Sequence, residues 1–154
     1  MFTITKSFTF DAAHHLPHLR PSYPDHPCAR VHGHTFVVEF ELQAPGLNEN
    51  HFVRDYGELK LVKEFIDTYF DHRDLNEILL EVECGTENEE RHLAIHSEMR
   101  NRGICPPPAI TAECMANFLF HWFKVEFSEL VAVRWKETPK TCAEYRPSDA
   151  GVWV

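Results

Sequence analysis

The chain has 154 residues and a formal net charge of −9, and 44% of its residues are hydrophobic and 25% charged. These values are typical of a globular protein and exclude a disordered chain, while the length suits one domain over residues 1–154. The acidic balance argues against nucleic acid or an anionic membrane surface as the main partner, and favours a small ligand.

The expected cellular compartment follows from sequence features that are missing. The N-terminus carries no apolar run of signal-peptide length, and no segment is apolar for long enough to span a bilayer. The 5 cysteines are odd in number and irregularly spaced, which is not typical of a disulfide framework. We therefore expect a cytoplasmic protein with reduced thiols and no membrane partner.

Two alternating segments, residues 1–14 and 32–42, are typical of β-strands with one apolar face. Side chains of equal parity share a face of a strand, so His14 lies with the apolar residues of the first segment. His32 and His34 lie in the same way on the apolar side of the second segment. If the two strands pair antiparallel, as sequence neighbours often do, the end of the first lies beside the start of the second and the three imidazoles converge.

Three converging imidazoles are typical of a catalytic zinc site, whose fourth coordination position stays open, whereas structural zinc sites have four protein ligands. The alternative for any single histidine is a buried core residue. Cys28 lies four residues before His32, in a Pro-rich loop over residues 17–31. Three interpretations of its thiol stay open. It is a fourth zinc ligand, which would make the site structural, or a nucleophile or base with a lowered pKa. The third interpretation is an inert buried cysteine.

A helix is predicted after the Pro45-Gly46 turn. Asp55 and Glu58 have the spacing of a helix cap, and apolar residues at helical spacing continue to a helix end near Asp71. Asp71 and His72 form an adjacent carboxylate and imidazole, which is a frequent acid–base device. The alternative is a pair of solvated charges at a helix end.

Residues 81–108 are acidic and polar and end in three consecutive prolines, which indicates an inserted excursion. Thr86 and Glu89 have capping-box spacing, so the excursion holds either a short helix or a solvated mobile loop. A second main helix, with one apolar stripe, is predicted from near Thr111 to near Phe127.

Two further strands are predicted at residues 130–137 and 141–146, linked by a turn at Pro139. The order is then ββααββ, an α+β domain with one four-stranded antiparallel sheet and two helices on its apolar face. Glu137 shares parity with Val133 and Trp135, so its carboxylate belongs to the apolar face and needs a partner there. That partner is either a bound group or a nearby Lys or Arg.

Six short motifs occur along nearly the whole chain outside the excursion: Phe10-Asp11-Ala12-Ala13-His14, Cys28-x-x-x-His32-Gly33-His34, Asp55-Tyr56-x-x-Leu59-Lys60, Asp71-His72-x-x-Leu75-Asn76, Thr111-x-Glu113 and Lys136-Glu137-Thr138. Together they resemble the 6-pyruvoyltetrahydropterin synthase and 6-carboxytetrahydropterin synthase family. The resemblance implies a tunnelling fold (T-fold), in which three subunits join their sheets into a barrel and two trimers stack as a homohexamer. Active sites then lie between subunits.

The same resemblance implies which residues form the site. It implies that Zn²⁺ is bound by His14, His32 and His34. It implies that protons are transferred by Cys28, Asp71 and His72. It also implies that the pterin is anchored by Glu137, with Glu113 beside it.

Three residues separate Cys28 from His32, a spacing that in this family marks the carboxy-forming branch. The resemblance therefore implies a zinc-dependent carbon–carbon lyase, 6-carboxy-5,6,7,8-tetrahydropterin synthase. Such an enzyme converts 7,8-dihydroneopterin triphosphate and water to 6-carboxytetrahydropterin, acetaldehyde and triphosphate, a step of 7-deazapurine (queuosine-type) biosynthesis. The alternatives are the pyruvoyl-forming triphosphate elimination on the same substrate, and a non-catalytic zinc-dependent pterin-binding protein whose metal site is closed by Cys28.

Overall fold

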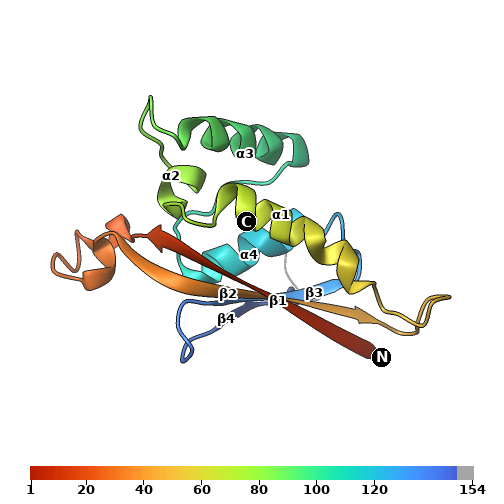
Figure 1. Cartoon of the computed structure of the whole chain (residues 1–154). Coiled ribbons are helices and arrows are strands. Elements are labelled where there is room, and N and C mark those ends of the chain that lie inside the picture. The colour runs from red at the N-terminus through yellow and green to blue at the C-terminus, as the bar shows by residue number, and fades with distance from the viewer. Residues whose placement is uncertain (149–154) are drawn as a thin grey trace.

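Four strands form one antiparallel sheet in the order β1-β2-β3-β4 in a computed structural model that describes residues 1–148 (Figure 1). Their bounds are Phe2–His14 for β1, His32–Ala44 for β2, Leu130–Lys136 for β3 and Ala143–Tyr145 for β4. The predicted sheet is confirmed, with a longer second strand and a shorter fourth one than expected. The end of the predicted domain, residues 149–154, lies outside the described residues.

The β1–β2 pairing has the register that the alternation predicted. His14 lies opposite His32, and Ala12 lies opposite His34. The connection between the strands contains two short 3-10 helices, η1 (Pro17–Leu19) and η2 (Pro27–Ala29). The buried apolar side chains of both strands all stand at even-numbered positions; they are Phe8, Phe10, Ala12, Phe36, Val38, Phe40 and Leu42.

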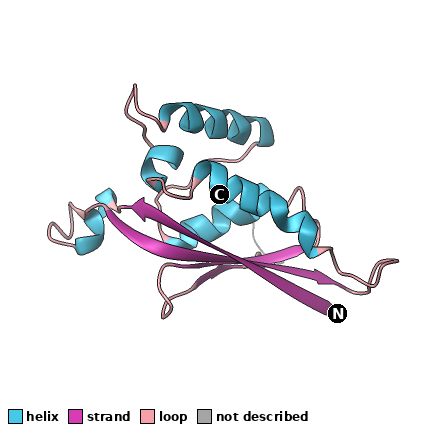
Figure 2. Ribbon diagram, in the orientation of Figure 1, coloured by secondary structure: helices cyan, strands magenta, loops and turns pink. Residues whose placement is uncertain are grey.

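The two predicted main helices cover this apolar face of the sheet (Figure 2). They are α1 (Lys60–Tyr69), which follows the 3-10 turn η3 (Tyr56–Leu59), and α4 (Ala112–Phe123). Asp55 caps η3 rather than α1 itself, because its carboxylate accepts the Gly57 amide at 2.7 Å. The helix α4 begins next to Thr111, as the sequence predicted, and the Thr111 hydroxyl caps it by accepting the Cys114 amide at 3.3 Å.

The structure adds two helices to the predicted order, α2 (Leu75–Leu79) and α3 (Glu89–Arg102). The excursion is therefore helical rather than a mobile loop, although α3 begins at Glu89 and not directly after Thr86, whose hydroxyl donates to the Glu83 carbonyl instead. Ile95 and Met99 of α3 are buried in the core. Within residues 1–148, no helix is both long and apolar enough to cross a membrane.

Two histidines of α3 attach it to the end of α2. The His92 ring contacts the carbonyl oxygens of Glu77 and Ile78 at 3.0 and 3.1 Å, and the His96 ring contacts that of Leu79 at 3.1 Å. These carbonyls belong to the last turn of α2, where a helix has no backbone donors left for them. The contacts explain why an acidic, polar segment is ordered against the core.

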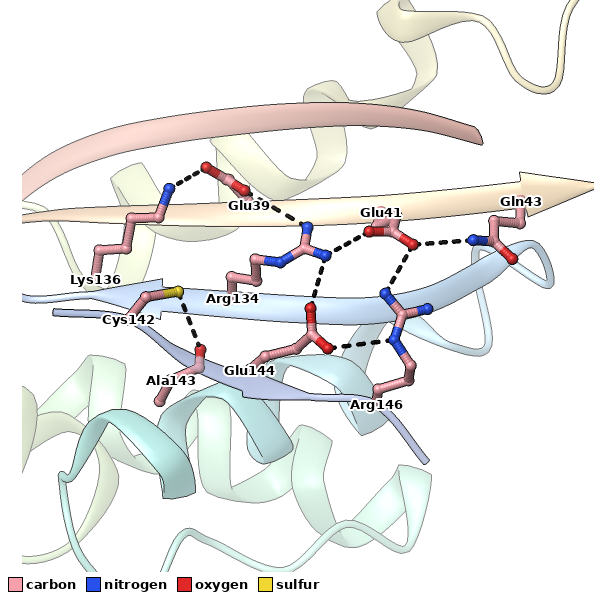
Figure 3. A network of polar contacts seen from close by, with 9 residues as sticks. All are labelled: Glu39, Glu41, Gln43, Arg134, Lys136, Cys142, Ala143, Glu144 and Arg146. Carbon is pink, nitrogen blue, oxygen red and sulfur yellow. Dashed lines mark hydrogen bonds and ion pairs between the residues drawn. The ribbon is translucent and has the colours of Figure 1, made fainter. Parts of the chain in front are cut away.

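The opposite face of the sheet carries a network of charged side chains that joins β2, β3 and the β4 region (Figure 3). Glu41 is at its centre, buried on the polar side, and accepts hydrogen bonds from Arg134 and Arg146. Burial raises the pKa of Glu41, but the two guanidinium groups outweigh it and hold the pKa below its usual range. The network therefore holds the short β4 against β3.

The packing of α3 leads to a stability prediction. Ile95→Ala removes a fully buried side chain, so the free energy of unfolding is expected to fall by about 2–5 kcal/mol. The neighbouring Leu93→Ala, at a side chain 61% exposed, is the matched control and is expected to change it by less than about 0.5 kcal/mol. Chemical denaturation measures both values, and equal small effects would show that α3 does not pack on the core.

Candidate metal centre

Three histidines converge where β1 ends and β2 begins. His14, His32 and His34 each offer a ligand atom, and these atoms all lie within 4.8 Å of one another. The centroid of the His14 ring lies 4.6 Å from that of His32 and 5.2 Å from that of His34, and the His32 and His34 centroids are 5.0 Å apart. The predicted convergence is confirmed, and this group could hold a metal ion.

Backbone carbonyls orient two of the rings. The carbonyl of Ile110 lies 2.8 Å from His14 Nδ1, and that of Arg30 lies 2.8 Å from His32 Nδ1. A proton on each Nδ1 leaves Nε2 free as a ligand atom, the usual arrangement in metal-binding histidines. Among the described residues, His14 Nε2 and His34 Nε2 are buried with no hydrogen-bond partner. Because buried polar atoms are normally paired, these nitrogens fit a bound cation.

The surroundings keep His14 neutral. Burial is the main cause that lowers the pKa of His14 to about 4; the Ile110 carbonyl opposes the shift, and the neighbouring His32 and His34 add to it. Burial and His32 also lower the pKa of His34. Because only a neutral imidazole can ligate a metal, the site is prepared for a cation without first losing protons.

Glu137, directly after β3, lies beside the histidine group. Its Oε1 lies 3.8 Å from His14 Nε2, and its side chain is 28% exposed. Burial raises the pKa of Glu137; the nearby His32 lowers it, and Glu113 in the first turn of α4 raises it further. Within residues 1–148 no Lys or Arg pairs with Glu137, and its contact with the neutral His14 imidazole is not an ion pair.

Cys28 lies in η2, in the loop that follows the metal-binding end of β1. Its amide donates to His26 Nδ1 at 3.2 Å, and its carbonyl accepts the Leu16 amide at 2.7 Å. The thiol is free and partly buried. The ligand group within 4.8 Å contains the three histidines without Cys28 Sγ, so this geometry gives no support to a closed four-ligand site.

Asp71 and His72 form a hydrogen-bonded pair, as the sequence suggested. Asp71 Oδ1 lies 3.1 Å from His72 Nδ1 and also accepts the Asp11 amide at 3.2 Å. Burial raises the pKa of Asp71, but the Asp11 amide and His72 outweigh it and bring the pKa below its ordinary value. His72 itself is 76% exposed and has a left-handed backbone with φ of 58°. The Asp11 amide thus fixes the Asp71 carboxylate, while the His72 ring is open to solvent.

His72 lines an open cavity of about 630 Å³ at the end of the β1–β2 hairpin that carries the three histidines. The cavity is lined by Asp11, Ala12, Ala13, Gly33, His34, Thr35, His72, Arg73 and Asp74. His34 thus belongs both to the histidine group and to the cavity wall. Within residues 1–148, however, no hydrogen bond or ion pair joins Asp71 or His72 to any of the three histidines.

Some residues that shape the site gave no functional signal in the sequence. Ile110 and Arg30 act through backbone carbonyls, which every residue carries. Asn76 was part of a motif without a role, yet its amide bonds the backbone of His15, directly after a ligand. Such contacts depend on which segments meet in space and could not be inferred from spacing.

Comparison with known proteins identifies the class of protein to which this fold and site belong. The sequence model of the 6-pyruvoyl tetrahydropterin synthase family matches residues 3–148, and the chain belongs to that family. It is similar to 6-pyruvoyl tetrahydropterin synthase of Caenorhabditis elegans, with a TM-score of 0.66 and 23% identity over 96% of each chain. That likeness supports the T-fold, the fold predicted from the motifs.

Curated relatives narrow the likeness within the family. The chain is 36% identical over 98 residues to a putative 6-carboxy-5,6,7,8-tetrahydropterin synthase of Archaeoglobus fulgidus, which covers 64% of this chain and 76% of that protein. It is 28% identical over 151 residues to the 6-carboxy-5,6,7,8-tetrahydropterin synthase of Haemophilus influenzae, covering 95% of this chain and 99% of that protein.

The lowered pKa of His14 leads to a prediction for the metal-free protein. Between pH 6.5 and about 4 the unfolded chain binds a proton at His14 that the folded chain does not. The free energy of unfolding should therefore fall as the pH falls through this range, by up to about 3 kcal/mol from this group. Urea denaturation at pH values from about 7 to about 4 measures the slope. The variant His14→Gln should lose the contribution of His14 to this slope. An unchanged slope in that variant would refute the assignment of the pH dependence to His14.

Proposed function

We propose that the chain is a zinc-dependent 6-carboxy-5,6,7,8-tetrahydropterin synthase that acts on 7,8-dihydroneopterin triphosphate. The observation that carries the proposal is the three-histidine group, whose geometry leaves out Cys28 Sγ and so leaves the thiol available for chemistry. Family membership supports the substrate class, and the relatives that bear this name support the carboxy-forming branch.

Zn²⁺ is the proposed metal, held by His14, His32 and His34. Neutral imidazoles suit Zn²⁺, and three of them leave a coordination position for substrate oxygens. When bound, the ion would act as a Lewis acid that makes hydroxyl and adjacent carbon-bound protons of the substrate side chain more acidic.

The protein's own groups then divide the proton transfers. Cys28, as a thiolate, is proposed to take a proton on one face of the substrate side chain, and His72 to exchange one on the other. Asp71 holds the His72 ring through the 3.1 Å contact with Nδ1, which leaves Nε2 directed away from the carboxylate. The high exposure of His72 is consistent with a group that meets a substrate.

Glu137 is proposed to anchor the pterin, with Glu113 beside it. A carboxylate can accept two N–H bonds from the aminopyrimidine edge of a pterin, and the charge strengthens both. Burial and Glu113 raise the pKa of Glu137, and within residues 1–148 no Lys or Arg pairs with it, which is consistent with a carboxylate whose partner is supplied by a ligand. Its position 3.8 Å from His14 would place that ring system beside the metal.

The active site is proposed to be shared between subunits of a homohexamer, a dimer of trimers. The absence of a hydrogen bond or ion pair between the Asp71–His72 pair and the histidines within residues 1–148 supports this arrangement. A pair that makes no such bond to the histidines of its own chain could serve the metal of a neighbouring subunit.

The product would enter 7-deazapurine (queuosine-type) biosynthesis in the cytoplasm. The five free cysteines of the described chain are consistent with a reducing compartment.

Product analysis tests the reaction. Purified zinc-loaded protein is incubated with 7,8-dihydroneopterin triphosphate, and the products are identified by mass spectrometry. Acetaldehyde and 6-carboxytetrahydropterin are expected, with kcat lowered about 10²–10⁴-fold in Cys28→Ala because a proton-transfer group is lost. Cys142→Ala, at an exposed cysteine in the loop before β4, is the matched control and should be unaffected.

Other products would decide between the alternatives. Pyruvoyltetrahydropterin without acetaldehyde would assign the chain to the pyruvoyl-forming reaction. Pterin binding without any turnover would favour the non-catalytic binding protein.

The proposed pterin anchor predicts a binding defect. Glu137→Gln replaces one acceptor oxygen by a donor and removes the charge, so KM is expected to rise roughly 10- to 100-fold, in line with a lost charge-assisted hydrogen bond. Steady-state kinetics measure it. Glu144→Gln, in the network on the opposite face of the sheet, is the matched control. An unchanged KM in Glu137→Gln would remove the anchor role.

A further inference from the structure

The edge of β1 near the metal centre is covered by the segment that carries the proton-transfer pair. We call residues 71–76 the strap. The Asp11 amide donates to Asp71 Oδ1, and the His72 amide donates to the Asp11 carbonyl at 2.6 Å. Two residues further on, the Ala13 amide donates to the Arg73 carbonyl at 2.9 Å. An edge strand otherwise leaves such groups unpaired, so the strap continues the pairing of the sheet over these positions.

Asn76 completes this pairing with its side chain. Its Oδ1 accepts the His15 amide at 2.9 Å, and its Nδ2 donates to the His15 carbonyl at 2.9 Å. Asn76 is 6% exposed, and its own amide donates to Asp74 Oδ1 at 2.9 Å. The side-chain amide of Asn76 thus satisfies both the backbone donor and the backbone acceptor of His15, as a neighbouring strand would. Because Asn76 is buried, water does not compete for these bonds.

His14 lies between two residues held in this way. Ala13 is fixed by the strap backbone, and His15 is fixed by Asn76. The ring of His14 is held from the other side by the Ile110 carbonyl at 2.8 Å. The direction of the His14 ring therefore depends on the strap as well as on the β1–β2 register.

We propose that Asn76 is a positioning residue for the metal centre, which fixes the end of β1 and so sets His14 relative to the strap that carries Asp71 and His72. The inference rests on the proposed zinc site and adds a residue to it that binds neither metal nor substrate. Within one chain the strap then joins the strand that carries His14 to the segment that carries His72: movement of the His14 backbone is transmitted to His72 through the pairing at Asp11 and Ala13.

The left-handed backbone of His72 is explained by the same contacts. A φ of 58° is unfavourable for a residue with a side chain. The bond from the His72 amide to the Asp11 carbonyl, together with the Asp71 carboxylate on the Asp11 amide, holds this conformation. Loss of the anchor at Asn76 should therefore loosen His72 as well as His14.

Zinc affinity tests the proposal without measuring turnover. Asn76→Ala removes both bonds to His15, whereas the isosteric Asn76→Asp keeps the acceptor and replaces the donor by an oxygen that repels the His15 carbonyl. Competition with a chromophoric chelator is expected to show zinc affinity lowered at least about 10-fold in both variants, as for residues that orient metal ligands. With Co²⁺ in place of zinc, the visible absorption bands should shift in the same variants because the ligand geometry changes.

Matched controls come from Asn48, a side chain that accepts two backbone amides, those of Asn50 and Phe52, in a loop at the other end of β2. Asn48→Ala and Asn48→Asp should leave zinc affinity and the Co²⁺ spectrum unchanged, even if Asn48→Ala lowers stability. If Asn76→Ala fails to fold, the isosteric Asn76→Asp still decides. Zinc affinity within twofold of wild type in Asn76→Asp, or an equal loss in the Asn48 variants, would overturn the proposal.

Amide hydrogen exchange tests the link to the proton-transfer pair. In the wild type, zinc is expected to slow exchange at the His72 amide, and in Asn76→Asp this protection should be largely lost. Protection that persists in the variant would refute the link. Wild-type protein that binds no zinc would overturn the proposed function and this inference together. Zinc binding without turnover would refute the reaction alone and leave the role of Asn76 in place.

Discussion

The antiparallel register between β1 and β2 is the constraint on which the rest of the structure depends. It sets His14 opposite His32 and Ala12 opposite His34, so the three imidazoles share a face and an end of the hairpin. Because side chains alternate with period two, a slip of one residue would send one strand's histidines to the polar face and its polar residues into the core. The apolar alternation that buries Phe10 and Phe36 therefore also builds the metal centre.

The aromatic core continues directly beneath that centre. The centroid of the Phe36 ring lies 5.4 Å from that of His14 and 5.3 Å from that of His34. The same ring packs on Trp135, with the two centroids 5.0 Å apart. This apolar floor explains why burial is the largest cause of the low pKa of His14. The same contacts serve stability and the candidate metal centre: the core holds the rings in place and lowers the pKa of His14 and His34, which favours the neutral form that binds a metal.

The strap adds a second level of organisation. An acid–base pair on a free loop would sample many orientations, whereas Asp71 and His72, the proposed pair, are hydrogen bonded to the edge of β1 near His14. Asn76 extends this attachment to His15. Acid–base groups act effectively only when their geometry is maintained, so pairing along an otherwise open sheet edge serves both the fold and the proposed reaction.

The sequence by itself determined the features that follow from periodicity and local chemistry. Parity placed the three histidines on one face, and the apolar stripe predicted a helix that starts near Thr111, where α4 begins. Tertiary structure alone decided that the excursion packs as α3, that Cys28 Sγ lies outside the ligand group, and that Asn76 bonds His15. The physical reason is that these outcomes depend on contacts between segments far apart in the chain, often through backbone atoms that every residue carries, and such contacts leave no periodic pattern in the sequence.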